Sequence, residues 1–495
     1  MENPCTNLTL FLFLSFSLFS AFTLSSFSPT DNHLINCGSS VDASVYNRHF
    51  ASDDDFSNPN SPLLSATRTT PLANQNPAPN SPQIYNTARI FWKPTKYEFE
   101  VNDPGTHMVR LHFHPFVSSD LDLSYAEFHV LVNGFVVLSN FTVANTATPL
   151  VKEYFIWVES NKLVITFMPT RRDEFGFVNA IEVISAPKDL IADTAIFVSG
   201  TRTEKFDGLT KQALETLYRI NVGGPKVTPF NDTVWRTWVP DDVFFEPSEI
   251  SRRIYSSGRI KYQNGGASRE VGPDFVYSSA RVIASTSASI PDANMTWNFA
   301  VMEGYQYLVR LHFCDIASMS LGLLYFNVYI NGNLAYDNLD LSSITYMLAS
   351  PFYADFVVES EKDGVLRVSV GPSNMSMTHT VDAILNGVEI MKMNNSVGSL
   401  DGKMCAGMVL RSWPRGKIGI FFPLVAVVCL VLSVSVLMHK RTVGGRDTVA
   451  WSKLPTDDAP GDKLKHEDDD DNDDDDEDNE IDNDEHEHLS GKAKA

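Results

Sequence analysis

The feature that most limits the fold of this chain is an internal repeat. Five sequence blocks of the 495-residue chain occur twice in the same order, about two hundred residues apart. The paired blocks are Tyr85–Arg89 with Tyr277–Arg281, Tyr97–Val101 with Trp297–Val301, Val109–Phe113 with Val309–Phe313, Phe128–Gly134 with Phe326–Gly332, and Asn179–Val183 with Asn386–Ile390. This repeat predicts two copies of one domain, which we place at residues 32–186 and 216–393, with residues 187–215 as the connector.

The repeated blocks alternate as β-strands do. In Val109–Phe113 the apolar side chains fall on one face of a strand, whereas Arg110 and His112 fall on the other. The blocks that begin at Phe128 and Phe326 also alternate, and they end in Asn-Gly, a pair that favours a two-residue hairpin turn. Short strands separated by turn signals predict an all-β chain with two tandem antiparallel β-sandwich domains.

Two apolar segments predict the topology of the chain. Residues 8–24 are apolar and precede small residues, which predicts a secretory signal peptide at residues 1–28. Unlike most signal peptides, this one has no Lys or Arg before its apolar segment. Residues 418–438 carry no charge and would form a transmembrane helix about 31 Å long. The alternatives are a retained anchor for the first segment and a buried soluble helix for the second. We expect a single-pass type I plasma membrane protein, with an extracellular juxtamembrane segment at 394–417 and a cytoplasmic tail at 439–495.

The positions of the glycosylation sequons support this orientation. Beyond the predicted signal peptide, five Asn-x-Ser/Thr sequons lie before the apolar segment and none lies after it. Because glycans are added in the secretory pathway, they mark surface positions outside the cell. The predicted glycosylation sites are Asn140, Asn231, Asn294, Asn374 and Asn394.

Cysteines are too few to stabilise the chain. Only Cys37, Cys314 and Cys405 would be extracellular, so at most one intrachain disulfide can form, and the sequence leaves the pairing open. The two domains must therefore be stabilised by packed hydrophobic cores.

Charge is concentrated at the C-terminus. The formal net charge is −22, and residues 439–495 hold 20 acidic against 8 basic side chains. The run 467–487 has no glycine at which a calcium loop of the EF-hand type could turn, so we expect a disordered, solvated tail. Weak binding of divalent ions or of a basic partner is the alternative. No basic stripe is present, which argues against nucleic-acid binding.

The sequence offers no convincing catalytic or metal site. His112 and His114 would share one face of a strand, and His129, if it lay on a neighbouring strand, would complete a zinc site. The recurrence of His112 as His312 favours a repeated packing position instead. No nucleophile elbow occurs, and the carboxylate pairs lie in polar turns, which argues against a glycosidase. We therefore expect no catalytic residues, no metal and no cofactor.

Aromatic side chains are the best candidates for ligand contacts. Most of them should be buried, because aromatic side chains dominate sandwich interiors. Trp235 and Trp238 lie in a turn-rich stretch beside Arg236 and Pro240, and we expect these two tryptophans to be exposed and to contact a ligand.

Several motifs together resemble a known family. They are Leu34-Ile-Asn-Cys-Gly38, the two Val-Arg-Leu-His-Phe strands, Tyr218-Arg-Ile-Asn-Val-Gly-Gly224 and Asn386-Gly-Val-Glu-Ile-Met-Lys-Met393. In this combination, the chain from about residue 32 to 450 resembles the tandem malectin-like ectodomain of plant receptor kinases of the Catharanthus roseus receptor-like kinase 1-like group. The resemblance implies a cell-surface receptor that binds cell-wall polysaccharide or secreted peptides of the rapid alkalinization factor type. It also implies a glycolipid-anchored co-receptor or kinase-bearing relatives as partners.

The C-terminal part departs from this family. The 57 residues after the apolar segment contain no Gly-rich loop, no Val-Ala-Ile-Lys, no His-Arg-Asp and no Asp-Phe-Gly motif. Without those groups ATP and magnesium cannot be positioned for phosphoryl transfer. We expect a non-catalytic, receptor-like binding protein. The alternatives are a truncated form of a receptor Ser/Thr kinase and a wall-acting enzyme.

Overall fold

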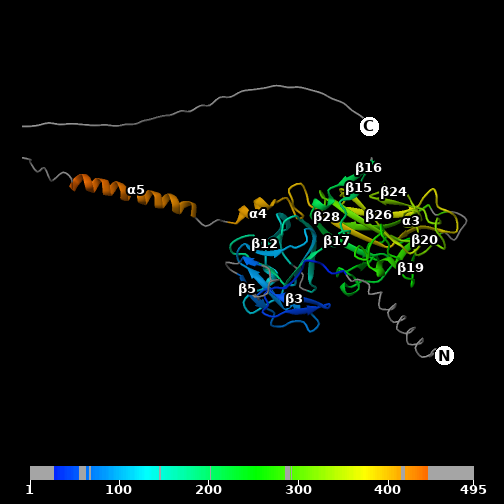
Figure 1. Ribbon diagram of the computed structural model, residues 1–495, viewed down its shortest axis with the longest axis horizontal. Helices are drawn as coiled ribbons and strands as arrows, with labels where there is room; N and C mark the ends of the chain where they lie inside the picture. The colour runs from blue at the N-terminus through cyan, green and yellow to red at the C-terminus, as the bar shows by residue number, and fades with distance from the viewer. Residues whose placement is uncertain are drawn as a thin grey trace, which may run out of the picture. The chain divides into compact units, whose positions relative to one another are not determined.

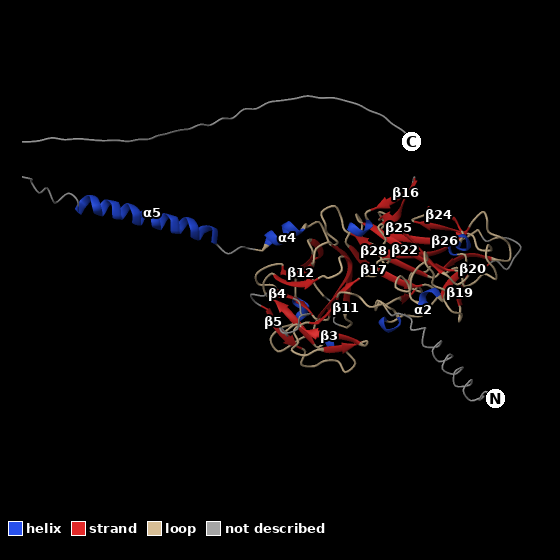
Figure 2. Ribbon diagram, in the orientation of Figure 1, coloured by secondary structure: helices blue, strands red, loops and turns tan. Residues whose placement is uncertain are grey.

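The computed structural model describes residues 27–54, 63–65, 69–143, 147–200, 202–284, 290, 292–413 and 418–443. The chain divides into two compact units, of which the N-terminal unit ends at Arg415. Figure 2 shows that the described part of this unit consists mainly of strands, as predicted. Residues 1–26 of the predicted signal peptide and the predicted acidic tail from residue 444 lie outside the described residues.

The first half of the N-terminal unit is a β-sandwich. One layer, in the order β11-β8-β14-β1-β3-β2, contains β1 (Asn32–Asn36), β2 (Ala43–Val45), β3 (Arg48–Ser52), β8 (Gly105–Phe113), β11 (Leu150–Val158) and β14 (Ala180–Ser185). The facing layer, in the order β10-β9-β12-β7-β4, contains β4 (Leu63–Ser65), β7 (Thr95–Glu100), β9 (Phe128–Val132), β10 (Phe135–Phe141) and β12 (Lys162–Pro169). A small sheet joins β5 (Thr69–Ala73), β6 (Thr87–Phe91) and β13 (Gly176–Val178), and the 3-10 turns are η1 (Gln83–Tyr85) and η2 (Leu123–Tyr125).

The second half repeats this plan. Its larger layer contains β15 (Thr194–Ser199), β16 (Arg202–Asp207), β17 (Leu214–Asn221), β18 (Val239–Pro240), β22 (Gln306–Cys314), β25 (Pro351–Glu359) and β28 (Gly387–Met393). The facing layer contains β21 (Met295–Ala300), β23 (Phe326–Ile330), β24 (Asn333–Leu339) and β26 (Val365–Pro372), and the small sheet contains β19 (Ser251–Tyr255), β20 (Ser279–Ala284) and β27 (Val381–Leu385). The short helical segments are η3 (Leu209–Lys211), η4 (Pro229–Asn231), α2 (Asp274–Tyr277) and α3 (Leu341–Thr345).

The predicted alternation is confirmed in both halves. Val109, Leu111 and Phe113 of β8 are buried in the first sandwich core, and Val309 and Leu311 of β22 are buried in the second. Each core therefore lies between two layers, as expected for an antiparallel sandwich. Both Asn-Gly hairpin turns also form, since β9 pairs with β10 and β23 pairs with β24.

The two halves share one continuous sheet. Strand β17 of the second half pairs with β11 of the first, and this pairing joins the two larger layers into a 13-stranded sheet. In Figure 1, β17 and β28 lie near the middle of the unit, between the strands of the two halves. A third hydrophobic core contains Met108 of the first half together with Leu308 and Met391 of the second. The two halves therefore share both backbone hydrogen bonds and buried apolar surface.

The segment predicted as a connector forms part of this sheet. Within residues 187–215, β15 and β16 pair as an antiparallel hairpin, and β15 also pairs in parallel with β25. Two further parallel pairings, β1 with β3 and β17 with β18, depart from the purely antiparallel prediction. All three are short, so the sandwiches remain predominantly antiparallel.

The predicted juxtamembrane segment folds back onto the first half. Ser399 pairs with Val136 of β10, and Leu400 is buried in the first core. Helix α4 (Ala406–Ser412) buries Val409 in a small cluster with Leu131 and Val136. The described part of residues 394–417 is therefore structural and is not simply a spacer.

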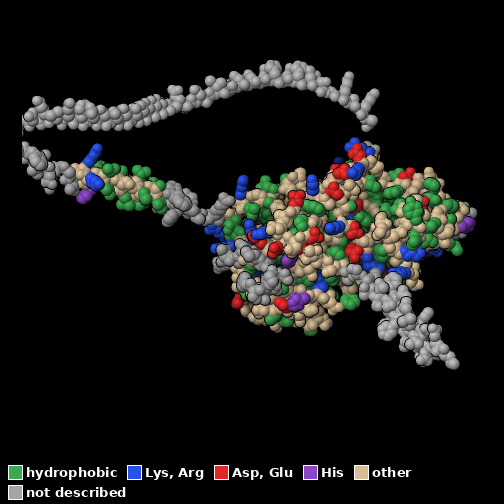
Figure 3. Space-filling model, viewed as in Figure 1, with side chains coloured by type: hydrophobic (Ala, Val, Ile, Leu, Met, Phe, Trp, Pro, Cys, Tyr) green, Lys and Arg blue, Asp and Glu red, His purple; other side chains and the backbone are tan. Residues whose placement is uncertain are grey.

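One described helix is long and apolar enough to cross a membrane. Helix α5 (Ile418–Val443) contains a window, Val425–Thr442, with a mean hydropathy of 1.6. In Figure 3 its surface is largely hydrophobic, with basic side chains at its C-terminal end, where Lys440 and Arg441 lie. The predicted transmembrane segment 418–438 falls within this helix.

Candidate functional site

A row of buried charged side chains crosses the continuous sheet from strand to strand. Each strand that contributes to the row supplies one side chain, and acidic and basic groups alternate along it. Across the sheet the row contains Glu182, Arg110, Glu153, Arg219, Glu389, Arg310 and Asp355. We call these seven residues the charge row.

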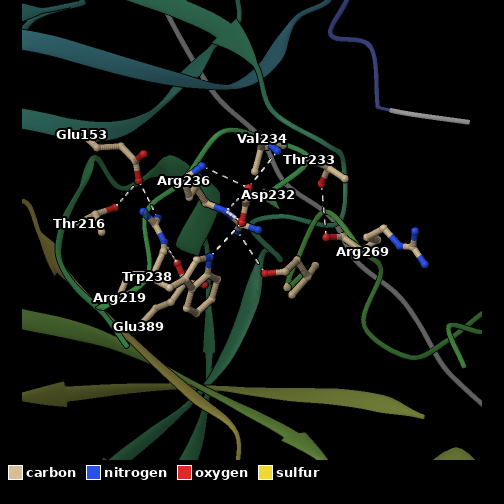
Figure 4. A network of polar contacts seen from close by, with 12 residues as sticks. Glu153, Thr216, Arg219, Asp232, Thr233, Val234, Arg236, Trp238, Arg269 and Glu389 are labelled. Carbon is tan, nitrogen blue, oxygen red and sulfur yellow. Dashed lines mark hydrogen bonds and ion pairs between the residues drawn. The ribbon is translucent and has the colours of Figure 1, made fainter. Parts of the chain in front are cut away.

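Ion pairs connect the charge row across the junction of the two halves. Arg110 Nη1 and Nε lie 2.9 Å from Glu182 Oε2 and 2.7 Å from Glu153 Oε2. Arg219 donates to the other oxygen of Glu153 at 2.6 Å and to Glu389 at 2.7 Å. Figure 4 shows the Arg219 side chain bridging Glu153 of the first half and Glu389 of the second. Arg219 therefore links the two halves electrostatically, as does the ion pair of Lys152 with Glu215 at 2.8 Å.

The arginines keep the buried glutamates ionised. Burial alone would raise the pKa of Glu153, but the guanidinium groups of Arg219 and Arg110 lower it to about 2. Burial is likewise outweighed at Glu182 and Glu389, where arginine neighbours hold the pKa well below its usual range. A carboxyl group held in this way cannot serve as a general acid near neutral pH.

The depressed pKa of Glu153 predicts an acid-sensitive junction. The folded-state pKa of about 2 lies below the ordinary value of 4.5, so the stabilisation is complete above pH 4.5 and is lost as the pH falls towards 2. We expect Glu153 alone to contribute about 3 kcal/mol to this loss. Urea unfolding of the N-terminal unit at a series of pH values would measure it. A free energy of unfolding that stays constant from pH 5 to about 2 would contradict the prediction.

The two halves of the N-terminal unit contain the same contacts around a buried histidine. His112 lies 2.9 Å from both the Tyr85 hydroxyl and a Glu182 oxygen. In the second half His312 lies 2.9 Å from the Tyr277 hydroxyl and 3.2 Å from Glu389. The interpretation of these histidines as a repeated packing position is confirmed.

The alternative zinc site at His112, His114 and His129 does not form. His129 lies on β9, which belongs to the facing layer and does not neighbour β8. Its Nδ1 accepts a hydrogen bond from the backbone of Asn140, whereas His114 packs edge-on against Tyr85. No group of three His, Cys, Asp or Glu side chains that could hold a metal occurs among the described residues. The strand alternation predicted a shared face but could not show which strands are neighbours.

The three predicted extracellular cysteines are free thiols in this structure. Cys37 and Cys314 are fully buried, one in the first half and one in the second. Burial raises the pKa of the Cys37 thiol well above its ordinary value, so it behaves as a small apolar side chain.

A cleft of about 600 Å³ lies between the two halves above the charge row. The β3, β8, β11 and β14 strands of the first half form one wall, and the loop 226–239 of the second half forms another. Arg110 Nη2 donates to the backbone oxygen of Val234 at 2.8 Å and so ties this loop to β8. The lining includes several aromatic and cationic side chains, among them Tyr46, Arg48, Tyr85, Lys226 and Trp235.

The two predicted ligand-contacting tryptophans differ in exposure. Trp235 is half-buried and lines the cleft. Trp238 is fully buried, so the prediction that it is exposed is wrong. Its indole Nε1 donates to Asp232 at 2.9 Å, and Asp232 also pairs with Arg236, as Figure 4 shows. The hydrogen bond to this buried carboxylate holds the Trp238 side chain in the interior, although the surrounding sequence is rich in turns.

The predicted glycosylation sites lie mostly on the surface. The Asn394 side chain is half-buried and accepts a hydrogen bond from the backbone of Ala213 at 2.7 Å. The remaining four side chains are exposed, and they are Asn140, Asn231, Asn294 and Asn374. Their glycosylation stays a prediction.

Arg48 and Arg219 of this site were not identified from the sequence. Arg219 lies in the block Tyr218–Gly224, where alternation with apolar neighbours places it on one face of a strand, as it does Arg110, but does not show which acidic side chain lies beside it. Arg48 has no such signal, because it lies at the start of a short strand with mixed composition.

The chain is similar to a known protein family and to plant receptor-like kinases. Residues 35–393 match the family model described as the malectin-like domain. The "Probable receptor-like protein kinase At5g24010" of Arabidopsis thaliana is 46% identical over 398 residues, covering 79% of this chain and 48% of that protein. The "Receptor-like protein kinase HERK 1" of the same plant is 41% identical over 376 residues, covering 76% of this chain and 44% of that protein. The chain thus spans about half the length of these relatives.

Solved structures agree over the N-terminal unit. The ANXUR1 extracellular domain from Arabidopsis thaliana aligns with a TM-score of 0.66 at 28% identity, covering 75% of this chain and 99% of that one. A chain of the plant peptide RALF23 complex with FER and LLG2 aligns with a TM-score of 0.65 at 31% identity, covering 76% of this chain and 99% of that one. Because 75–76% of the chain is more than either half contains, both alignments include residues of both halves.

Proposed function

Because the chain belongs to the malectin-like domain family, we propose that it is a receptor-like protein of the plant plasma membrane whose N-terminal unit binds extracellular ligands. The ligands are secreted peptides of the rapid alkalinization factor type, cell-wall carbohydrate, or both. The observation that supports peptide binding most directly is the alignment with 99% of a chain from a peptide complex that also contains FER and LLG2. A glycolipid-anchored co-receptor and kinase-bearing relatives are the proposed partners.

Binding without catalysis is consistent with the buried site. Arginine neighbours lower the pKa of the three glutamates of the charge row, so none of these three can act as a general acid near neutral pH. The kinase motifs are also absent from these 495 residues, although the relatives are named as kinases. The helix α5 that follows the N-terminal unit would cross the membrane and hold that unit outside the cell.

A second candidate is the ligand-binding part of a longer receptor Ser/Thr kinase. The names of the relatives and the coverage of about half their length favour it. Sequencing of full-length transcripts separates the two candidates, because an in-frame kinase exon would establish the second.

Ligand binding can be measured on the N-terminal unit alone, because its cores are complete without α5 and similar ectodomains have been crystallised. We expect the secreted unit to bind an alkalinization-type peptide, more tightly with a glycolipid-anchored co-receptor protein, or to bind wall polysaccharide fragments. Calorimetry with each ligand class, and with a scrambled peptide and a neutral glucan as controls, measures this. Failure to bind every peptide and polysaccharide tested would refute the proposed function.

A further inference from the structure

Three segments of the second half contain no Asp, Glu, Lys or Arg. They are residues 316–325, 341–350 and 373–380, which lie between β22 and β23, between β24 and β25, and between β26 and β27. Across the whole chain 20% of the residues are charged. A soluble surface normally carries charged side chains of both signs, so their absence from all three segments requires an explanation.

Strand pairing and hydrogen bonds bring the three segments together. Strand β22 pairs antiparallel with β25, and β23 pairs antiparallel with both β24 and β26, so the three connections leave the sandwich at the same end. The Gly322 N–H donates to Ser342 Oγ at 2.9 Å, and Ser376 Oγ donates to the backbone oxygen of Tyr325 at 2.8 Å. We call these three segments the uncharged end.

Large apolar side chains of the uncharged end are exposed. Met319 is 96% exposed and Tyr346 is 78% exposed. The other exposed members of this set are Leu321, Met347, Met375 and Met377. These side chains lie on three neighbouring segments and form an apolar surface. A surface of this kind usually marks a place where something binds and covers it.

The backbone holds this surface in a fixed conformation. Tyr346 has a φ of 56°, and its N–H closes α3 by donating to the backbone oxygen of Ser342 at 3.0 Å. Ala349 also has a φ of 56°, and its N–H donates to the backbone oxygen of Asp315 at 2.9 Å. Left-handed conformations cost free energy for residues other than glycine, so the surrounding contacts impose them here. The apolar side chains therefore belong to a structured surface.

Two of the predicted glycosylation sites lie at this surface. Asn374 belongs to the uncharged end itself, is exposed and directly precedes Met375. Asn294 is also exposed, and its Oδ1 occupies the space that a Cβ atom on Gly371 would fill, three residues before Asn374. A glycan on Asn374 would therefore begin within the apolar surface.

The third residue of the Asn374 sequon is engaged in the folded segment. The Ser376 hydroxyl donates to Tyr325, as described above, and accepts a hydrogen bond from the backbone nitrogen of Ser373 at 3.0 Å. That hydroxyl is part of the sequence that receives the glycan. We therefore expect the glycan to be added before this segment folds. Substitution of Asn374 removes the glycan and leaves both hydrogen bonds of Ser376 in place, so it is the cleaner test.

We propose that the N-linked glycan on Asn374 lies over the uncharged end and covers its methionines and Tyr346. The C–H groups of a sugar ring pack against an aromatic face, and flexible methionine side chains adapt to the shape of the sugar. The hydroxyl groups of the glycan face water and supply the solubility that charged side chains supply elsewhere. The cover is thus part of this chain and not a second copy or a partner protein. The inference rests on the proposed function only in requiring passage through the secretory pathway.

Methionine oxidation in the N-terminal unit, secreted from plant cells, tests the proposal. We expect mass spectrometry to find a glycan on Asn374. In dilute hydrogen peroxide, the methionines of the uncharged end should be oxidised at least about fivefold faster in Asn374→Gln, because oxidation follows exposure. Met408 of α4, which is 56% exposed outside this end, should be oxidised at an unchanged rate. Asn231→Gln, which removes a sequon outside the uncharged end, should change neither rate.

A second measurement needs no substitution. Enzymatic trimming of the glycans from the folded unit should accelerate oxidation of the same methionines, and thermal unfolding would verify that each sample is folded. An unoccupied Asn374, or oxidation at the uncharged end that loss of the glycan leaves unchanged, would overturn the inference. Self-association or peptide binding by the glycosylated unit that Met319→Ser abolishes would also overturn it, because a protein would then cover this surface. A glycan on Asn231 and binding of an alkalinization-type peptide would leave the proposed function standing in each of these cases.

Discussion

Replacing Arg219 by alanine is expected to lower the free energy of unfolding of the N-terminal unit by about 3–5 kcal/mol. The substitution removes a guanidinium group that two buried carboxylates share, since Arg219 Nη2 lies 2.6 Å from Glu153 and Nε lies 2.7 Å from Glu389. Glu153 then keeps its ion pair with Arg110, and Glu389 keeps its contact with His312. Both glutamates are nearly inaccessible to water, so water cannot replace the guanidinium. Denaturant unfolding followed by circular dichroism would measure the loss.

A matched control distinguishes burial from charge. Arg367 also forms an ion pair, at 2.7 Å with Asp363, but both side chains are more than 40% exposed. Arg367→Ala should therefore cost at most about 1 kcal/mol, because exposed ion pairs contribute little. Equal losses for Arg219→Ala and Arg367→Ala would contradict the conclusion that the charge row holds the two halves together.

Replacing Gly38 by alanine is expected to destabilise the unit by about 2–5 kcal/mol. Gly38 has a φ of 70°, and an added Cβ atom would lie 2.1 Å from the backbone oxygen of Ala88. Relief of that clash requires movement of a buried strand, β6, in addition to the cost of the left-handed conformation. The equivalent Gly223 has the same φ and would place its Cβ 2.4 Å from the Ala280 oxygen, so Gly223→Ala should behave alike.

The control for this prediction is Gly134 in the hairpin turn between β9 and β10. Its φ is 89°, but nothing lies within 4 Å of an added Cβ atom. Gly134→Ala should therefore cost only about 1–2 kcal/mol, the cost of the backbone conformation alone. Thermal unfolding of the three variants would measure the difference. If Gly38→Ala were no more destabilising than Gly134→Ala, the close approach to Ala88 would not be a constraint on the fold.

The candidate site shows where sequence reasoning succeeded and where it failed. The recurrence of His112 as His312 correctly indicated a structural position, because both rings bridge a tyrosine and a glutamate. The prediction for Trp238 failed because the composition of its neighbours does not reveal Asp232 six residues earlier as a buried hydrogen-bond acceptor. Local composition reports the average environment of a segment and not the partner of one side chain.

The sequence alone determined the architecture of each half. Alternation and hairpin turns are local properties of the chain, so Val109–Phe113 and the two Asn-Gly pairs are sufficient to predict the strands and turns that contain them. Duplication of the blocks likewise indicated that the plan occurs twice.

Only the tertiary structure decided how the halves meet. The pairing of β17 with β11 joins the sheets, and it places Arg219 beside Glu153, 66 positions earlier in the chain. It also places the loop that carries Trp235 over Arg48 and so creates the cleft. Such contacts depend on which strand edges pair and which buried charges become neighbours in the folded chain. Burial makes an unpaired charge costly, so each buried charge needs a partner of opposite sign. No local sequence pattern specifies which residue that partner is.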